Sequence, residues 1–188
     1  MIELHREIYQ LKVSLKGITP MIWRRFLVPG AVTLSELHEV IQQVMGWTDS
    51  HLHGFMINGK RYGKPDPEFE MGEELLDESC FRVREILKKE GASIQYTYDF
   101  GDHWQHNLRL EKILPLDPNK QLPFCIAGRR SCPPEDVGGV WGYKDFLKAI
   151  HDENHPRHEE LIEWAGDDFD PEDFDPEEVN QALRLSSL

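Results

Sequence analysis

Carboxylates and imidazoles gather in one short stretch of the chain, residues 98–106. Two aspartates and two histidines stand there within eight residues: Asp99, Asp102, His103 and His106. An imidazole beside a carboxylate can hold a divalent metal ion, and such an ion polarises an oxygen or generates hydroxide from water. The stretch therefore makes a metal-dependent hydrolase one candidate function.

The spacing within this stretch weighs against that function. If the stretch forms a β-hairpin, Asp99 and His106 point to opposite sides, so the ligands converge only where the loop folds back. In the competing interpretation, the Asp102 carboxylate accepts hydrogen bonds from backbone amides of a turn, and His106 is a hydrogen-bonded core histidine. We therefore predict no cofactor and keep a divalent metal as the alternative.

Other histidines and cysteines add little to the metal hypothesis. His51 and His53 share one face if their segment is extended, although solvated or packed side chains explain this pair more simply. The spacing of Cys125 and Cys132 falls outside that of ordinary zinc knuckles, so we expect thiols there. The candidate metal ligands are His51, His53, Asp102, His103 and His106.

A second polar cluster lies downstream of the hairpin. Arg129 and Arg130 precede Glu135 and Asp136, so the arginines either hold an anion or pair with these carboxylates, and pairing is favoured. The nearby glycines form no phosphate loop, because the strand, lysine and hydroxyl of that motif are missing. The candidate binding residues are Asp99, Asp102, His103, Trp104, His106, Arg129, Arg130, Glu135 and Asp136.

Local patterns predict the elements that must position these residues. Residues 9–15 alternate apolar and polar side chains, which is typical of a strand with one buried face, and residues 21–28 follow as an antiparallel partner. Residues 33–46 open on a capping box and end on a glycine, which predicts a helix. The pair Asn58-Gly59 predicts a hairpin turn. Residues 80–90 are open to either a helix or a strand.

The register of one hairpin decides where the candidate site lies. A three-residue loop over residues 101–103 pairs Phe100 with Trp104 and puts every apolar side chain on one side of the sheet. A two-residue loop scatters these side chains over both sides. We therefore predict the three-residue loop, with Gly101 available for a left-handed conformation or a bulge and His106 on the aromatic face.

The charge of the chain is unevenly distributed. The net charge is −13, and residues 151–188 hold 13 acidic residues against two arginines. Non-specific binding to duplex DNA requires many lysines and arginines against phosphates, so we expect a protein partner rather than nucleic acid. The sequence does not predict an oligomeric state.

Length and composition set the broad class. With 188 residues, 39% of them hydrophobic and 29% charged, the chain is typical of one globular domain spanning residues 1–188. No apolar run reaches the roughly 18 residues of a membrane span, and the opening residues lack the apolar stretch of a signal peptide. We therefore expect a cytoplasmic protein that does not contact a membrane.

Residues 98–106, followed by Glu111, resemble the plasmid pRiA4b ORF-3-like family. Residues 9–25, 47–55 and 125–143 are also similar, so the resemblance covers nearly the whole chain. Members are encoded on plasmids and beside insertion sequences, which implies an origin in mobile elements but no established activity. The motif residues of the family that are present are Asp99, Gly101, Asp102, Trp104 and His106. No serine or tyrosine in an arginine-rich setting supports recombinase chemistry.

The sequence therefore predicts an α+β fold, with an antiparallel sheet, helices packed on one side and an acidic helical C-terminus. We expect a noncatalytic binding or accessory module related to plasmid and mobile-element proteins. A metal-dependent hydrolase with its site in the 99–106 hairpin is the alternative. A third hypothesis is that the acidic tail imitates nucleic acid toward a basic partner.

Overall fold

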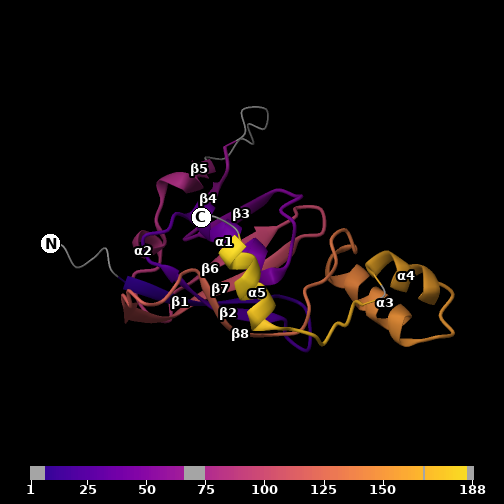
Figure 1. The fold of residues 1–188 in the computed structure, drawn as a ribbon. Coiled ribbons are helices and arrows are strands. Elements are labelled where there is room, and N and C mark those ends of the chain that lie inside the picture. The colour runs from indigo at the N-terminus through magenta and orange to yellow at the C-terminus, as the bar shows by residue number, and fades with distance from the viewer. Residues whose placement is uncertain (1–6, 66–74, 167, 186–188) are drawn as a thin grey trace.

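The structure is a computed structural model and describes residues 7–65, 75–166 and 168–185. The strands are β1 (Glu7–Leu15), β2 (Trp23–Pro29), β3 (His53–Ile57), β4 (Lys60–Gly63), β5 (Leu75–Asp77), β6 (Ser93–Tyr98), β7 (Trp104–Pro115) and β8 (Phe124–Arg129). They form one sheet in the order β5-β4-β3-β6-β7-β1-β2-β8 (Figure 1). Neighbouring strands are antiparallel except β4 and β5, which run parallel. The fold is therefore α+β, as the sequence predicts.

Short and medium helices connect and cover these strands. They are α1 (Leu34–Met45), the 3-10 helix η2 (Glu78–Cys80), α2 (Val83–Ile86), α3 (Gly139–His151), α4 (His158–Ala165) and α5 (Pro176–Leu185). The open question about residues 80–90 is thus answered by a short helix. Within the described ranges, no helix combines the length and the apolar character that crossing a bilayer requires.

The local capping and turn signals are confirmed. Thr33 and Glu36 form the predicted capping box at the start of α1, and Gly46 ends the helix in a left-handed conformation. Asn58 and Gly59 both have positive φ, 51° and 77°, in the turn between β3 and β4. These short motifs satisfy backbone groups locally, so they are predictable without knowledge of the rest of the fold.

The two faces of the sheet differ in burial. In β1, Leu11 and Val13 are fully buried, whereas Lys12 between them is half-exposed. Helices α1 and α5 cover the apolar face: Gln42 of α1 donates a hydrogen bond to the hydroxyl of Tyr96, and Asn180 of α5 bonds the backbone of β8. The other face, which we call the polar face, carries half-exposed and exposed polar side chains.

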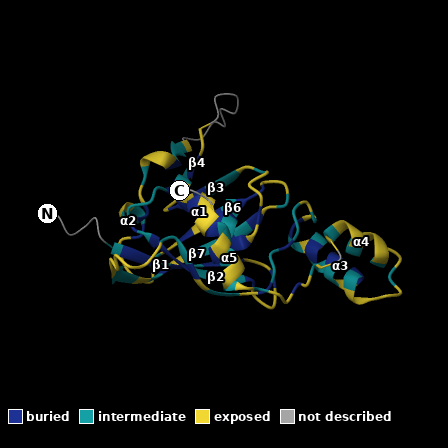
Figure 2. Ribbon diagram, viewed as in Figure 1, coloured by how far each residue is buried: buried dark blue, intermediate teal, exposed yellow. Residues whose placement is uncertain are grey.

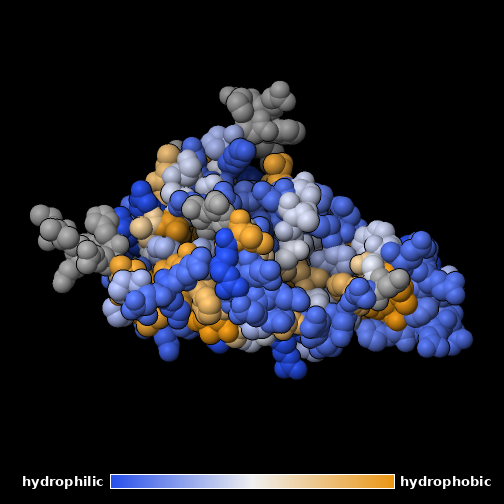
Figure 3. All heavy atoms as spheres, viewed as in Figure 1, coloured by the Kyte–Doolittle hydropathy of each residue, from blue (hydrophilic) through white to orange (hydrophobic). Residues whose placement is uncertain are grey.

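Helices α3 and α4 lie beyond one end of the sheet (Figure 1). Helix α4 has no buried residue, and α3 buries Tyr143 and Phe146 (Figure 2). Hydrophilic residues cover most of this end of the molecule in the view of Figure 3. Helices α4 and α5 both fall within the acidic segment 151–188.

The hairpin of β6 and β7 differs from the predicted register by two residues. Tyr98 lies opposite Trp104, so the predicted pairing of Phe100 with Trp104 is wrong and the loop runs from Asp99 to His103. Phe100 is 46% exposed. Because the error is an even number of residues, the predicted side is still correct: Tyr98 and Trp104 both project into the core.

The turn chemistry at Asp99 explains the shortened strand. Oδ1 of Asp99 accepts hydrogen bonds from the amides of Gly101, at 2.8 Å, and Asp102, at 3.3 Å. This side-chain turn allows Asp99 to adopt a φ of 53°, and His103 takes 58° at the other end of the loop. The left-handed conformation predicted for Gly101 therefore occurs at these two residues instead.

Candidate functional site

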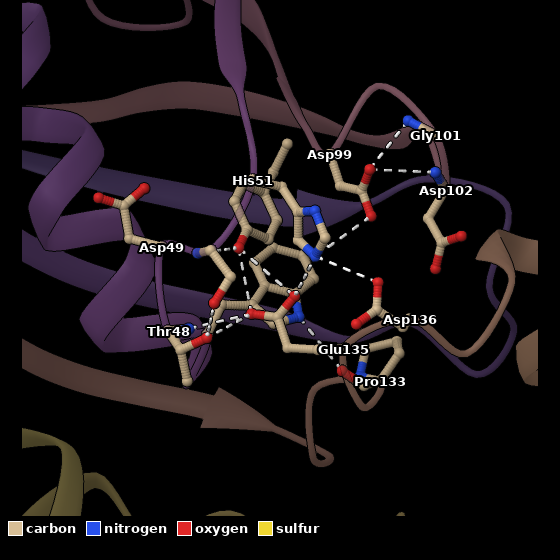
Figure 4. A network of polar contacts seen from close by, with 12 residues as sticks. Thr48, Asp49, His51, Asp99, Gly101, Asp102, Pro133, Glu135 and Asp136 are labelled. Atoms are coloured by element: carbon tan, nitrogen blue, oxygen red, sulfur yellow. Dashed lines mark hydrogen bonds and ion pairs between the residues drawn. The ribbon is translucent and has the colours of Figure 1, made fainter.

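His51 stands at the centre of a cluster of carboxylates at one end of the β6–β7 hairpin (Figure 4). Its Nε2 atom lies 3.2 Å from Oδ1 of Asp136, 3.7 Å from Oε2 of Glu135 and 3.8 Å from Oδ2 of Asp99. These residues come from three segments far apart in the sequence. We call the four residues the His51 cluster.

Asp99 is fixed in the cluster by its own loop. Its backbone amide donates to the carbonyl of Leu52, at 2.8 Å, which ties the loop to the segment that carries His51. Since Oδ1 is occupied by the two loop amides, Oδ2 is the oxygen that faces His51. Asp99 is only 7% exposed, so this carboxylate has few water contacts and a defined direction.

Glu135 is held by a second set of hydrogen bonds. Its Oε1 accepts from the amide and hydroxyl of Thr48, at 3.0 and 3.2 Å, and from the hydroxyl of Tyr98, at 3.1 Å. Burial and the nearby carboxylate of Glu135 raise the pKa of Tyr98, so the phenol stays a hydrogen-bond donor. Trp47 anchors the same segment by donating from Nε1 to the carbonyl of Pro133.

Asp136 and Asp102 have different roles at the rim of the cluster. The side chain of Asp136 is 72% exposed and its backbone is left-handed, with a φ of 58°. Asp102 instead turns its Oδ2 to the amide of Gly138, at 3.0 Å, at the N-terminus of α3. Asp102 therefore fastens the hairpin to α3, whereas Asp136 leaves the His51 cluster open to solvent on one side.

The cluster combines excess negative charge with a buried nitrogen. Three carboxylates surround one imidazole, and even a protonated His51 offsets only one of the three charges. Nε2 of His51 is itself shielded from solvent and has no aligned hydrogen-bond partner in the described part of the chain. Like charges at such distances repel, and a bound cation relieves that repulsion.

Comparison with known proteins places this chain among relatives. A model of the plasmid pRiA4b ORF-3-like protein family matches residues 7–178. The chain belongs to this family. The match confirms the resemblance carried by the 98–106 motif.

Two proteins similar to this pRiA4b ORF-3-like protein carry no assigned function. The uncharacterized protein y4hQ of Sinorhizobium fredii is 39% identical over 178 residues, which cover 94% of this chain and 90% of the relative. The crystal structure of MM3350 from Methanosarcina mazei Go1, a protein of unknown function, has a TM-score of 0.83 and 44% identity. That comparison covers 93% of this chain and 98% of the other. The family membership therefore establishes no catalytic or binding activity.

The predicted ligand His53 belongs to a separate cluster in this pRiA4b ORF-3-like protein. Its ring stacks on that of His38, with centroids 3.3 Å apart, and its Nε2 lies 2.9 Å from a carboxylate oxygen of Glu78. Strand β3 begins only at His53, so His51 lies outside the extended segment that would align the two side chains. The metal-ligand geometry accordingly groups His53 with His38 and Asp49, apart from His51.

His38 is the buried member of this second group, which we call the His38–His53 cluster: His38, Asp49, His53 and Glu78. Nδ1 of His38 lies 2.8 Å from the hydroxyl of Tyr96, and Nε2 lies 2.8 Å from Oδ1 of Asp49. Burial, followed by the proximity of His53, lowers the pKa of His38 to about 4. Figure 4 shows the Asp49 carboxylate pointing away from the His51 cluster.

The remaining predicted hairpin residues lie away from the His51 cluster. His106 is fully buried against Trp47 and Tyr96, and burial lowers its pKa to about 3. Its core position matches the prediction, but neither ring nitrogen has an aligned hydrogen-bond partner among the described residues. His103 is exposed and contacts Gln105, 3.0 Å away.

The arginines downstream also differ from expectation. Arg130 is buried and pairs with Glu172 at 2.8 Å rather than with Glu135 or Asp136, so the predicted pairing is wrong for this residue. It also donates to the carbonyl of Pro20. Arg129 is exposed and lies at the end of β8. The partner of Arg130 comes from the acidic segment, which no local pattern around residue 130 indicates.

Proposed function

We propose that this protein binds a divalent metal ion at the His51 cluster and acts as a metal-dependent hydrolase. The observation that carries the proposal is the position of Nε2 of His51, within 3.8 Å of oxygens from Asp99, Glu135 and Asp136. One nitrogen and several carboxylate oxygens form a donor set that suits zinc or manganese.

The spacing of the donor atoms supports this proposal. Two ligand atoms about 2.1 Å from a tetrahedral ion lie about 3.4 Å apart. In the structure, ligand atoms from His51, Asp99 and Asp136 all lie within 4.8 Å of one another. Small side-chain movements would therefore close the set around an ion, and the exposed side of Asp136 would leave room for water or substrate.

The residues of this chain also suggest how the chemistry is divided. A divalent ion at this place would polarise a substrate oxygen or acidify a bound water. Within the cluster, Glu135 is held by Thr48 and Tyr98, so its Oε2 faces Nε2 of His51 and can accept a proton. His51, Asp99 and Asp136 would then serve as ligands and Glu135 as the base.

Metal titration by calorimetry tests the binding step. Chelator-treated protein should take up one equivalent of Zn²⁺ or Mn²⁺, and a ligand at 100 times its Kd should raise stability by about 2.7 kcal/mol. His51→Ala and Asp99→Asn should each weaken binding at least about tenfold, in line with the loss of one metal ligand. His151→Ala and Asp145→Asn, at exposed positions on α3, are matched controls that should bind normally.

Activity measurements separate the two candidate functions. Model phosphate and carboxylate esters should be hydrolysed by the metal-loaded protein, and Glu135→Gln should lose the rate while keeping the metal. A protein that binds metal without hydrolysis would instead be the noncatalytic binding module predicted from the sequence. Equal metal binding by His51→Ala and the wild type would contradict the site itself.

A further inference from the structure

The polar face of the sheet carries a cluster of cations although the chain as a whole is acidic. A groove of about 630 Å³ on this face is lined mostly by residues of β1, β2 and β7, together with Met21 and Gly91. Its charged lining residues are Lys12, Arg25, Arg109, Glu111 and Lys112. Four positive charges therefore face one negative charge, in a protein whose net charge is −13.

The strand register places three of these cations in a row. Lys12 of β1 lies opposite Arg25 of β2 on one side and opposite Arg109 of β7 on the other. Adjacent strands are only about 4.8 Å apart, and like charges directly opposite one another destabilise a sheet. A row of this kind works against folding, and such exceptions are expected where a surface serves binding.

Glu111 forms a direct ion pair with one member of the row. Its two carboxylate oxygens accept from Nε and Nη2 of Arg25, at 2.6 and 2.9 Å. Hydrogen bonding to Arg25 lowers the pKa of Glu111, so the carboxylate stays charged and committed to this pair. Both oxygens are thus engaged with Arg25, and Lys12 and Arg109 remain opposite each other.

An aromatic ring lies within the same cluster. Trp23 of β2 is half-buried, with Nζ of Lys12 4.7 Å and Cζ of Arg25 5.2 Å from its ring centroid. Amide side chains from Gln10 and Asn107 also line the groove. The groove thus offers cations for phosphates and neutral donors and acceptors for base edges, and the Trp23 ring beside its cations Lys12 and Arg25 is one on which a base can stack.

We propose that the polar face binds single-stranded nucleic acid. An acidic peptide would satisfy the cations but has no use for the tryptophan between two of them, whereas a single strand supplies both phosphates and exposed rings. The expectation of a protein partner rests on net charge, which averages this face with the acidic segment 151–188. The His51 cluster has no part in this second activity.

Fluorescence anisotropy with a labelled 20-nucleotide single strand tests the proposal. The wild type should bind RNA or DNA at low salt, with a slope of log affinity against log salt of about −0.7 for each phosphate contacted. Lys12→Gln combined with Arg109→Gln should weaken binding at least about tenfold and reduce the slope by about 1.4. Trp23→Ala should weaken binding about tenfold through lost stacking while leaving the slope nearly unchanged.

The controls distinguish this proposal from general charge effects and from the metal site. Lys144→Gln combined with Lys148→Gln makes the same charge change on α3 and should bind as the wild type does. Melting temperatures verify that every variant folds, and the Lys12–Arg109 double variant should melt no lower than the wild type. Chelator should leave binding unchanged. Absence of binding at 50 mM salt, equal loss in both double variants, or tighter binding to a poly-glutamate peptide would each overturn the proposal.

Discussion

The His51 cluster and the His38–His53 cluster use the same residue types to different ends. In the His38–His53 cluster, each ring meets a dedicated carboxylate: Asp49 for His38 and Glu78 for His53. In the His51 cluster, one nitrogen faces three carboxylates and has no aligned hydrogen bond among the described residues. The balance of partners, more than the residue types, therefore separates a structural network from a candidate binding site.

The difference follows from where the side chains are fixed. His38 lies on helix α1, its ring stacks on that of His53, and the hydroxyl of Tyr96 in β6 occupies its Nδ1 atom. The His51 cluster is built by loops, whose amides consume one oxygen of Asp99 and one of Glu135 and leave the others directed inward. A network in which every polar atom has a partner stabilises the fold, whereas a network with unpaired polar atoms can still bind a ligand.

The largest expected effect is that acid destabilises the folded protein through its two buried histidines, His38 and His106. The pKa of His38 is lowered to about 4 and that of His106 to about 3, so both rings are neutral in the folded protein at neutral pH. Unfolded histidine titrates near 6.5, so the unfolded chain binds more protons below that pH. The stabilisation is present above pH 6.5 and is lost as the pH falls toward 4 and then 3.

Denaturant titration over this pH range measures the effect. The free energy of unfolding should fall by up to roughly 3 kcal/mol through His38 and by up to roughly 5 kcal/mol through His106, by the linkage between pKa shift and stability. His38→Gln should flatten the pH dependence, whereas His151→Ala, at an exposed position, should leave it intact. A slope that is the same in His38→Gln and the wild type would contradict the assignment of His38.

Truncating the central histidine of each cluster sharpens the comparison. His38→Ala should lower the free energy of unfolding by roughly 2–4 kcal/mol, because it opens a cavity, leaves Asp49 without its histidine partner and leaves the hydroxyl of Tyr96 with only the bond from Gln42. His51→Ala should cost under about 1 kcal/mol, because His51 is partly exposed and its Nε2 has no aligned hydrogen bond to a described residue that the substitution would remove.

Chemical denaturation and metal titration of the two variants give the matched readings. His38→Ala, measured at a temperature where it is folded, should retain metal binding at the His51 cluster, and His51→Ala should lose it. The opposite pattern, in which His51→Ala unfolds and His38→Ala loses the metal, would make the His38–His53 cluster the metal site and the His51 cluster the structural one.

Sequence predicted the elements better than their register. Alternation in residues 9–15, the capping box at Thr33 and the Asn58-Gly59 turn each depend on neighbouring residues, and each is found in the structure. The hairpin register depends on one side-chain turn at Asp99, which ends β6 two residues early. The predicted side of the sheet is nevertheless correct, because burial of one face permits only register shifts by an even number of residues.

The site was predicted in part, and the missing part is a matter of long-range contact. Asp99, Glu135 and Asp136 were identified by type, and His51 was proposed only together with His53. These residues come together only because the segments around residues 51, 99 and 135 are in contact, and the periodicity of the sequence does not predict such long-range contacts. The pairing predicted for Arg130 is wrong for the same reason, since its partner Glu172 lies in a distant segment.

The smallest expected effect tests whether the motif or the geometry defines the site. His103 stands beside Asp102 in the motif, yet it is exposed and is not grouped with His51 in the candidate metal sets. His103→Asn keeps a residue that tolerates the left-handed conformation, so the free energy of unfolding should change by less than about 0.5 kcal/mol. Calorimetry should show unchanged metal affinity. A loss of affinity in His103→Asn as large as that in His51→Ala would instead assign the metal to the hairpin loop and contradict the contrast between the two clusters.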